Sequence, residues 1–272
     1  MDDRPIGVFD SGAGGLTSVR RLRAEAPGES LVYFGDCLRA PYGGLAPEEI
    51  KRLSRRNARF LRSRNVKAII VSCNTSTANA MAELAADNAD IPIVGTVVPT
   101  AEAAVRTSQS GRIGVLATEA TIRSGLYERT ILGLRPDAAV TSRSCPKLVP
   151  LVETGHTSKD DPALRAALEE DLAPLRAARV DTVVLGCTHY PLIEEAILDV
   201  LGYPAATVDS GAACVGSVLA ALRDRDALAD PSHEPTEQYF CSGRKDDFLA
   251  VARGFLGRSI DGLTQEMDIS AI

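Results

Sequence analysis

The sequence lacks the segments that mark membrane and secreted proteins. No apolar run approaches the roughly 18 residues that a membrane-spanning helix needs. The strand-like residues 6–9 follow the N-terminus almost at once, which leaves no room for a signal peptide. We therefore expect a cytoplasmic protein with no membrane partner.

Cysteine and histidine are sparse. Six cysteines in 272 residues are too few for a disulfide scaffold and form no C-x-x-C pair, so we expect reduced thiols. Of the three histidines, His156 and His233 have no ligand spacing around them that would support a metal site. The sequence therefore predicts no metal centre.

The chain also has no basic surface of the kind that binds nucleic acids, since its formal net charge is −6. One stretch rich in Lys and Arg covers residues 51–62. Its apolar residues Leu53, Phe60 and Leu61 recur at helical spacing, which favours a helix with a solvated basic face over a phosphate site. We expect no nucleic-acid partner.

Nucleotide-binding signatures are missing too. The glycine-rich loop at residues 10–15 (DSGAGG) departs from G-x-G-x-x-G because Thr17 occupies the third glycine position, and no G-x-x-x-x-G-K-[ST] motif occurs. Such a loop can bind a carboxylate-bearing ligand at the N-terminus of the next helix, or it can simply let that helix pack on its strand. Asp10, at the end of the strand, can hold an ammonium group or orient a thiol.

The chain does contain a repeated sequence pattern, an apolar strand followed by a cysteine. It occurs at residues 66–75 (VKAIIVSCNT) and at 180–189 (VDTVVLGCTH). A weaker echo relates residues 6–11 (IGVFDS) to 113–118 (IGVLAT), which is either chance or a sign of duplication. Because ligands bind beyond the carboxyl ends of parallel strands, the two thiols can meet in one pocket, as a proton acceptor and a proton donor.

Alternating strand and helix patterns indicate an α/β protein with parallel sheets. We predict strands near 5–10, 30–35, 67–72, 111–116, 181–185 and 205–208, and helices that include 47–64, 75–86 and 164–178. The duplication favours two similar α/β lobes with the active site in the cleft between them. The expected division is 1–98 plus 209–272 for the first lobe and 99–208 for the second.

Cys73 and Cys187 are the candidate reactive thiols, whereas the other four cysteines have no companions that distinguish them from buried core residues. Asn74 and Thr75 follow Cys73, and Thr188 and His189 follow Cys187, so each thiol is next to groups that can bind a carboxylate. His189 can exchange a proton with Cys187 or stabilise its thiolate.

These segments resemble the glutamate racemases of the aspartate/glutamate racemase superfamily. The matching motifs are GVFDSG at 7–12, GGLT at 14–17, YFGD at 33–36, PYG at 41–43, CNT at 73–75, PLVE at 150–153, LGCTHYPL at 185–192 and VDSG at 208–211. The resemblance implies a cofactor-independent racemisation of glutamate that supplies D-glutamate for peptidoglycan, by an enzyme that is usually a homodimer.

The resemblance also implies roles for individual residues. Cys73 would act on D-glutamate with the help of Asp10, and Cys187 on L-glutamate with the help of Glu153 and His189. The residues expected to line the substrate site are Asp10, Ser11, Pro41, Tyr42, Gly43, Asn74, Thr75, Thr118, Thr121, Thr188 and His189.

Two departures from the family pattern, Cys37 and Ser72, fall near the expected pocket wall and bear on substrate range. Three alternatives remain open at this point. One is a racemase for aspartate or another acidic amino acid. Another is a decarboxylase or cis–trans isomerase acting on a dicarboxylate, although arylmalonate-type decarboxylases keep only one of the two cysteines. The third is a non-catalytic protein that holds an acidic ligand or partner, as some racemases are thought to do with DNA gyrase.

Overall fold

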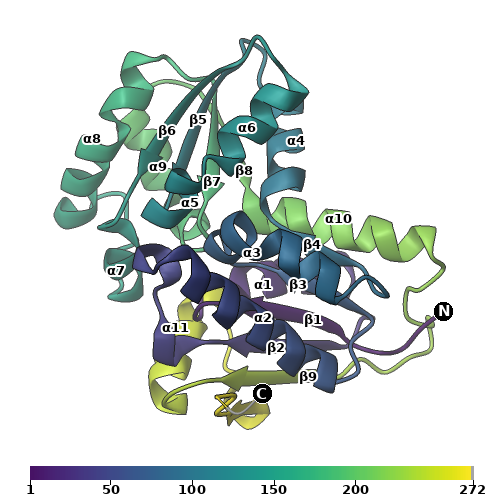
Figure 1. Ribbon diagram of the computed structural model, residues 1–272. Helices are drawn as coiled ribbons and strands as arrows, with labels where there is room; N and C mark the ends of the chain where they lie inside the picture. The colour runs from purple at the N-terminus through teal and green to yellow at the C-terminus, as the bar shows by residue number, and fades with distance from the viewer. Residues whose placement is uncertain (271–272) are drawn as a thin grey trace.

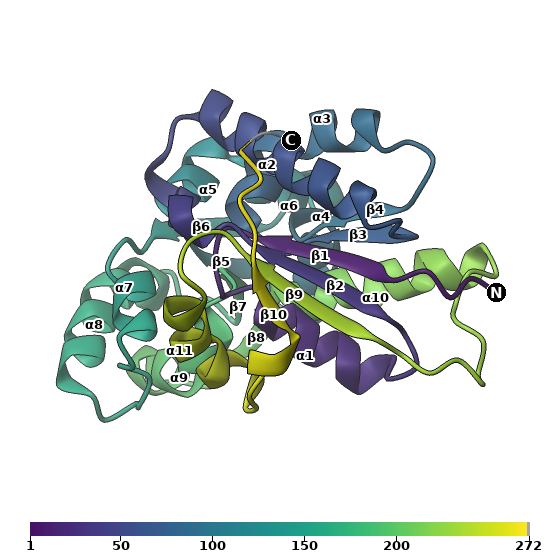
Figure 2. The same cartoon turned by 90° about the horizontal axis from the view of Figure 1, so that it is seen from below.

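The computed structural model describes residues 1–270, which form two parallel β-sheets with helices on both faces of each (Figures 1 and 2). The first sheet has the strand order β10-β9-β2-β1-β3-β4 and the second the order β6-β5-β7-β8. Every strand pairing in both sheets is parallel. The predicted α/β fold with two parallel-sheet lobes is confirmed.

The strands are β1 (Ile6–Asp10), β2 (Leu31–Gly35), β3 (Ala68–Val71), β4 (Ile93–Gly95), β5 (Arg112–Ala117), β6 (Ala139–Ser144), β7 (Thr182–Gly186), β8 (Ala206–Asp209), β9 (Glu237–Cys241) and β10 (Thr264–Glu266). The α-helices are α1 (Leu16–Glu25), α2 (Pro47–Ser63), α3 (Asn74–Asp87), α4 (Val97–Thr107), α5 (Glu119–Ser124), α6 (Leu126–Leu134), α7 (Leu148–Glu153), α8 (Pro162–Ala177), α9 (Glu194–Leu201), α10 (Ser210–Asp224) and α11 (Lys245–Leu256). Short 3-10 helices cover Cys37–Arg39, Tyr42–Gly44, Tyr190–Ile193 and Asp261–Leu263.

The six predicted strands correspond to β1, β2, β3, β5, β7 and β8. The strands β4, β6, β9 and β10 were not predicted. β4, β6 and β10 each lie at an edge of a sheet, and β9 is next to such an edge. β4 and β10 have three residues each, and β6 (AVTSRS) is polar and largely half-buried, so these strands lack the apolar runs that mark buried parallel strands.

The two sheets repeat one arrangement. The order β2-β1-β3-β4 in the first matches β6-β5-β7-β8 in the second. In this match β5 takes the place of β1, and β7 takes the place of β3, which are the two pairs of segments that resemble each other in sequence. The ends of β3 and β7 therefore occupy equivalent positions in the two lobes.

The chain crosses between the sheets twice, through α4 on the way out and α10 on the way back (Figure 1). α10 contacts β3 and β4 of the first sheet as well as β7 and β8 of the second. The expected lobe boundaries at residues 98 and 208 fall within or directly before these two helices. That division of the chain remains a prediction.

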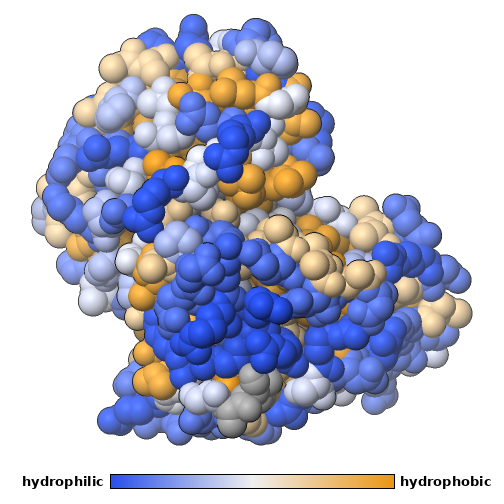
Figure 3. All heavy atoms as spheres, viewed as in Figure 1, coloured by the Kyte–Doolittle hydropathy of each residue, from blue (hydrophilic) through white to orange (hydrophobic). Residues whose placement is uncertain are grey.

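Side chains that alternate along the strands fill separate cores on the two faces of the first sheet. Phe9 packs with Phe34, Phe60 and Leu61 on the side of α2 and α3, whereas Val8 points to the side of α1. The outer face of α2 is charged and strongly hydrophilic (Figure 3), as the sequence pattern predicted. Among residues 1–270, no helix combines the length and the hydropathy that crossing a bilayer requires.

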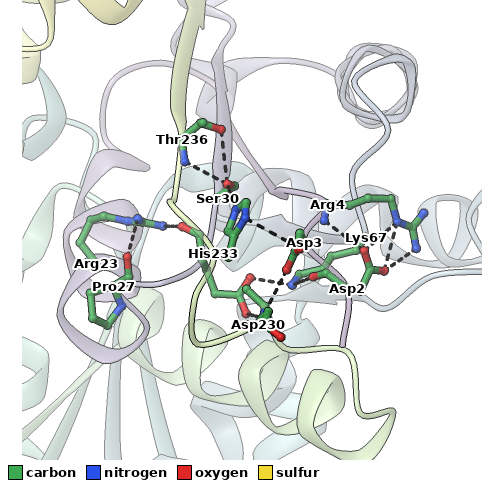
Figure 4. A network of polar contacts seen from close by, with 12 residues as sticks. Asp2, Asp3, Arg4, Arg23, Pro27, Ser30, Lys67, Asp230, His233 and Thr236 are labelled. Atoms are coloured by element: carbon green, nitrogen blue, oxygen red, sulfur yellow. Dashed lines mark hydrogen bonds and ion pairs between the residues drawn. The ribbon is translucent and has the colours of Figure 1, made fainter.

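A polar network closes the amino ends of β1, β2 and β3 (Figure 4). Lys67 is buried, donates a hydrogen bond of 2.5 Å to the carbonyl oxygen of Asp2 and pairs with the buried carboxylate of Glu29 at 2.6 Å. Ser30 and His233 are hydrogen-bonded at 2.8 Å between Oγ and Nε2. The polar groups of these residues thus have partners within the protein.

Candidate active site

Residues that follow the carboxyl ends of β1, β3, β5 and β7 surround one cavity between the two lobes. Cys73 follows β3 and Cys187 follows β7, and both thiols line this cavity. The space around these residues that protein atoms do not fill is about 410 Å³, which includes solvent at the mouth of the cavity. The position of the cavity suits one small molecule bound between equivalent strand ends.

The cavity brings together all but one of the site residues expected from the sequence. Its lining consists of Asp10, Ser11, Gly12, Ala40, Pro41, Tyr42, Gly43, Cys73, Asn74, Thr75, Thr118, Val149, Glu153, Cys187, Thr188 and His189. The exception is Thr121, which is buried and lies behind Thr75 and Thr118, with its Oγ1 at 3.4 and 3.0 Å from theirs.

Cys73 occupies the N-cap position of α3, where its Sγ accepts the backbone N–H of Ser76 at 3.4 Å. Burial and the nearby Asp10 raise its pKa to about 11, and the hydrogen bonds with Ser76 and Ser11 only partly offset this. The thiol is 4% exposed. Cys73 is therefore protonated at neutral pH, although the helix N-terminus offers a thiolate some stabilisation.

Cys187 has a cationic neighbour instead. His189 Nδ1 lies 3.6 Å from Cys187 Sγ, and its Nε2 lies 2.9 Å from Glu153 Oε1. Burial lowers the pKa of His189, but the hydrogen bonds to Cys187 and Glu153 outweigh it and raise the pKa from 6.5 to about 10. The imidazole is therefore charged at neutral pH and can stabilise a thiolate at Cys187.

Asp10 projects into the cavity from the end of β1. Its Oδ2 accepts the N–H of Gly12 at 3.1 Å, whereas its Oδ1 is buried and has no hydrogen-bond partner among residues 1–270. Burial raises the pKa of this carboxyl, against the opposing effects of His189 and the backbone N–H of Gly12. A buried acceptor without a partner is costly, so the free oxygen indicates a donor on a ligand.

The glycine-rich loop lies against the Cys187 loop of the other lobe. A methyl group on Gly14 would come within 2.6 Å of His189 Cε1, so only glycine fits there. Thr17, which interrupts the nucleotide fingerprint, donates from Oγ1 to the carbonyl oxygen of Thr188 at 3.3 Å. These residues tie the first loop of one lobe to the reactive loop of the other.

Tyr42 lines the cavity, but its hydroxyl points away from the open space. It donates to Asp36 Oδ2 at 2.5 Å and accepts from Asn57 Nδ2 at 3.1 Å. Polar groups on the other wall come from hydroxyls, since Thr75 Oγ1 and Thr118 Oγ1 lie 2.9 Å apart. No Lys or Arg occurs among the residues that line the cavity in the described chain.

Sequence reasoning missed Gly12, Ala40 and Val149, which also line the cavity. These residues carry no reactive group. The only sequence signal for them is that they lie within or directly before the motifs GVFDSG, PYG and PLVE. The two departures from the family pattern lie outside the cavity: Ser72 is buried with its Oγ 2.7 Å from Ser18 Oγ, and Cys37 lines an adjoining groove.

Comparisons with known proteins agree with this geometry. Residues 17–218 match the family described as Asp/Glu/Hydantoin racemase. The chain belongs to this family. A glutamate racemase of Streptococcus equi subsp. equi is 42% identical over 263 residues, which cover 96% of this chain and 98% of that protein.

Solved structures extend the similarity to the whole fold. A glutamate racemase isoform of Bacillus anthracis superposes with a TM-score of 0.92 at 34% identity and covers 98% of both chains. A glutamate racemase of Francisella tularensis in complex with D-glutamate gives a TM-score of 0.93 at 30% identity and covers 100% of both chains. The family and the racemase class of enzyme predicted from the sequence are confirmed.

Proposed function

We propose that this protein interconverts L- and D-glutamate without a cofactor, by proton transfer between two thiols on opposite sides of the substrate α-carbon. The observation that carries the proposal is that Cys73 and Cys187, at equivalent strand ends of the two lobes, line one cavity. The structure of a relative in complex with D-glutamate supports glutamate as the substrate.

The groups around the cavity can recognise each part of glutamate. The partnerless Oδ1 of Asp10 can accept from the substrate ammonium group. The Asn74 amide and the hydroxyls of Thr75 and Thr188 offer hydrogen-bond donors to a carboxylate. Since the lining has no Lys or Arg, hydroxyl, amide and backbone donors together with the His189 cation must hold both carboxylates.

The unequal surroundings of the two thiols determine which thiol is ionised and which is protonated in the free enzyme. With His189 charged beside it, Cys187 acts as a thiolate and takes the α-proton of L-glutamate. Cys73, whose pKa is raised to about 11, holds a proton that it delivers to the opposite face. In the reverse direction Asp10, at the same end of the cavity, assists Cys73 in losing its proton.

The α-proton of an amino acid is very weakly acidic, so the carbanion needs strong stabilisation. The two thiols are only 4% and 6% exposed, which excludes most water from the reacting atoms. Donors that are already fixed in a buried site stabilise developing charge more than water does. The charged His189 and the N-terminus of α3 are such fixed groups.

Proton NMR in deuterated water, with no cofactor added, tests the proposal. We expect L-glutamate to yield D-glutamate that carries deuterium at the α-carbon, while the remaining L-glutamate keeps its proton early in the reaction, because different thiols remove and deliver protons. Cys73→Ala and Cys187→Ala should each abolish racemisation. Cys214→Ala is the matched control, because this cysteine is also buried but does not line the cavity.

Other outcomes would indicate a different mechanism, substrate or function. Full turnover in either cysteine variant would refute the two-base assignment. Activity with aspartate but not with glutamate would change the substrate and keep the mechanism. If no acidic amino acid or dicarboxylate exchanged its proton with the solvent, the protein would be a binding protein without this catalytic activity.

We also propose, from the resemblance, that the enzyme is a cytoplasmic homodimer whose D-glutamate enters peptidoglycan precursor synthesis. Deletion of its gene should then make growth depend on added D-glutamate. Light scattering coupled to gel filtration should give twice the chain mass of 28.8 kDa, and a monomer mass would contradict the homodimer.

A further inference from the structure

Asn74, the residue directly after Cys73, is held by three hydroxyl groups. Its Oδ1 accepts from Tyr127 at 2.6 Å and from Thr96 at 2.9 Å, and its Nδ2 donates to Ser210 at 3.0 Å. All four residues are at most 3% exposed. The oxygen of the amide is thereby fixed toward these donors, and one N–H of its amide remains for the cavity that Asn74 lines.

Two of the three hydroxyls come from the segments that join the two lobes, and the third comes from the second lobe. Thr96 directly precedes α4, and Ser210 is the first residue of α10, so each stands where the chain crosses between the sheets (Figure 1). Tyr127 lies on α6 of the second lobe. A movement of one lobe against the other must therefore change the hydrogen bonds of Asn74.

Tyr127 also touches the loop of the second thiol. A methyl group on Gly186, the residue directly before Cys187, would lie only 3.3 Å from Tyr127 Cε2. The tyrosine ring thus packs against the end of β7 while its hydroxyl bonds to the residue after Cys73. Burial raises the pKa of Tyr127, so its hydroxyl remains a donor.

We propose that Tyr127 is a positioning residue that holds the Cys73 and Cys187 loops in register across the two lobes, through its hydroxyl on Asn74 and its ring on Gly186. The inference rests on the racemisation proposed above. Tyr127 does not line the cavity among the described residues, so it acts on the substrate only through Asn74 and the Cys187 loop.

The variant Tyr127→Phe separates the two contacts. It keeps the ring against Gly186 and removes only the hydroxyl that fixes Asn74. The amide then keeps Thr96 on its oxygen and Ser210 on its nitrogen but loses the shorter of the two hydrogen bonds to Oδ1, which loosens its orientation and misaligns the N–H that faces the substrate. Since small misplacements of positioning groups are costly mainly in the transition state, kcat should fall more than KM changes.

We expect Tyr127→Phe to lower kcat by roughly tenfold or more and to change KM by less than about threefold. The isotope effect measured with α-deuterated glutamate should increase, because proton transfer becomes more rate-limiting. Tyr203→Phe is the control: it removes a tyrosine hydroxyl in the same lobe that bonds to the carbonyl oxygen of Leu175, outside the cavity. It should leave kcat, KM and the isotope effect unchanged.

A kcat within about twofold of the wild type would overturn the proposal, and so would a lower kcat with an unchanged isotope effect, which reports a loss of folded enzyme. Should Tyr127→Phe not fold, Thr96→Val removes the other donor from the same oxygen and carries the same expectations. Absence of racemisation in the wild-type protein would refute the proposed function itself, which keeps the two failures distinct.

Discussion

Replacing His189 by Gln tests whether this residue maintains the proposed thiolate at Cys187. In the structure the pKa of His189 is raised from 6.5 to about 10, in spite of burial, through Cys187 and Glu153. The contact with Cys187 is the largest of the effects that raise this pKa. Hydrogen bonds to charged groups contribute about 1.5–3 kcal/mol, and we expect the coupling of the imidazolium to a Cys187 thiolate to fall in this range.

We therefore expect His189→Gln to lower kcat/KM by roughly 50- to 100-fold near pH 7. The factor should be the same for L- and D-glutamate, because the equilibrium constant between enantiomers in water is one. Without the cation, a thiolate at Cys187 loses its stabilisation, so kcat/KM of the variant should rise with pH through the neutral and mildly alkaline range. The wild type should change little over the same range.

Circular dichroism of the glutamate solution follows the reaction in both directions. His156→Gln is the matched control, because His156 pairs with Asp161 at 2.8 Å and does not line the cavity. A loss of less than about fivefold, with the same flat pH profile as the wild type, would refute the reasoning that the imidazolium maintains the thiolate.

Two further predictions concern stability. Lys67→Met should lower the free energy of unfolding by about 3–5 kcal/mol, because it leaves the buried Glu29 carboxylate without its cation. Urea denaturation measures this loss, and the double variant Lys67→Met/Glu29→Gln should recover most of it. A loss below about 1 kcal/mol would contradict the prediction. Because the pKa of His189 is higher in the folded protein, its contribution to stability should be fully present below pH 6.5 and disappear as the pH rises through about 10. The difference in Tm between wild type and His189→Gln should therefore shrink from pH 6.5 to pH 10, and a constant difference would show that this proton linkage is absent.

The sequence identified the central strands and the reactive loops because both leave local signals. β1, β3, β5 and β7 are buried apolar runs, and the cysteines that follow β3 and β7 stand beside hydroxyl and amide residues. The edge strands β4, β6 and β10 gave no such signal, since an edge position tolerates polar and exposed residues. Edge strand β6, for example, has no fully buried residue.

The supporting residues of the site could not be read from the sequence for a different reason. Tyr127 lies 53 positions from Asn74, and Asp36 acts beneath Tyr42 through a hydroxyl that points away from the cavity. Tyr127 belongs to none of the motifs named above, and Asp36 ends the YFGD motif without any sign in the sequence that it supports Tyr42. Their roles depend on which segments the fold brings together, and a single sequence does not contain that information.

The duplicated architecture explains how one cavity can present two similar thiols in different surroundings. Repetition of the strand order places Cys73 and Cys187 at equivalent strand ends, as proton transfer to either face of one carbon requires. The residues that differ between the repeats then set the charge: Asp10 and a helix N-terminus lie beside Cys73, whereas His189 and Glu153 lie beside Cys187. The symmetry of the backbone thus supplies the geometry, and the different side chains give the two thiols different affinities for a proton. The proposed two-thiol mechanism needs both, because two thiols with identical surroundings would both be protonated or would repel each other as thiolates.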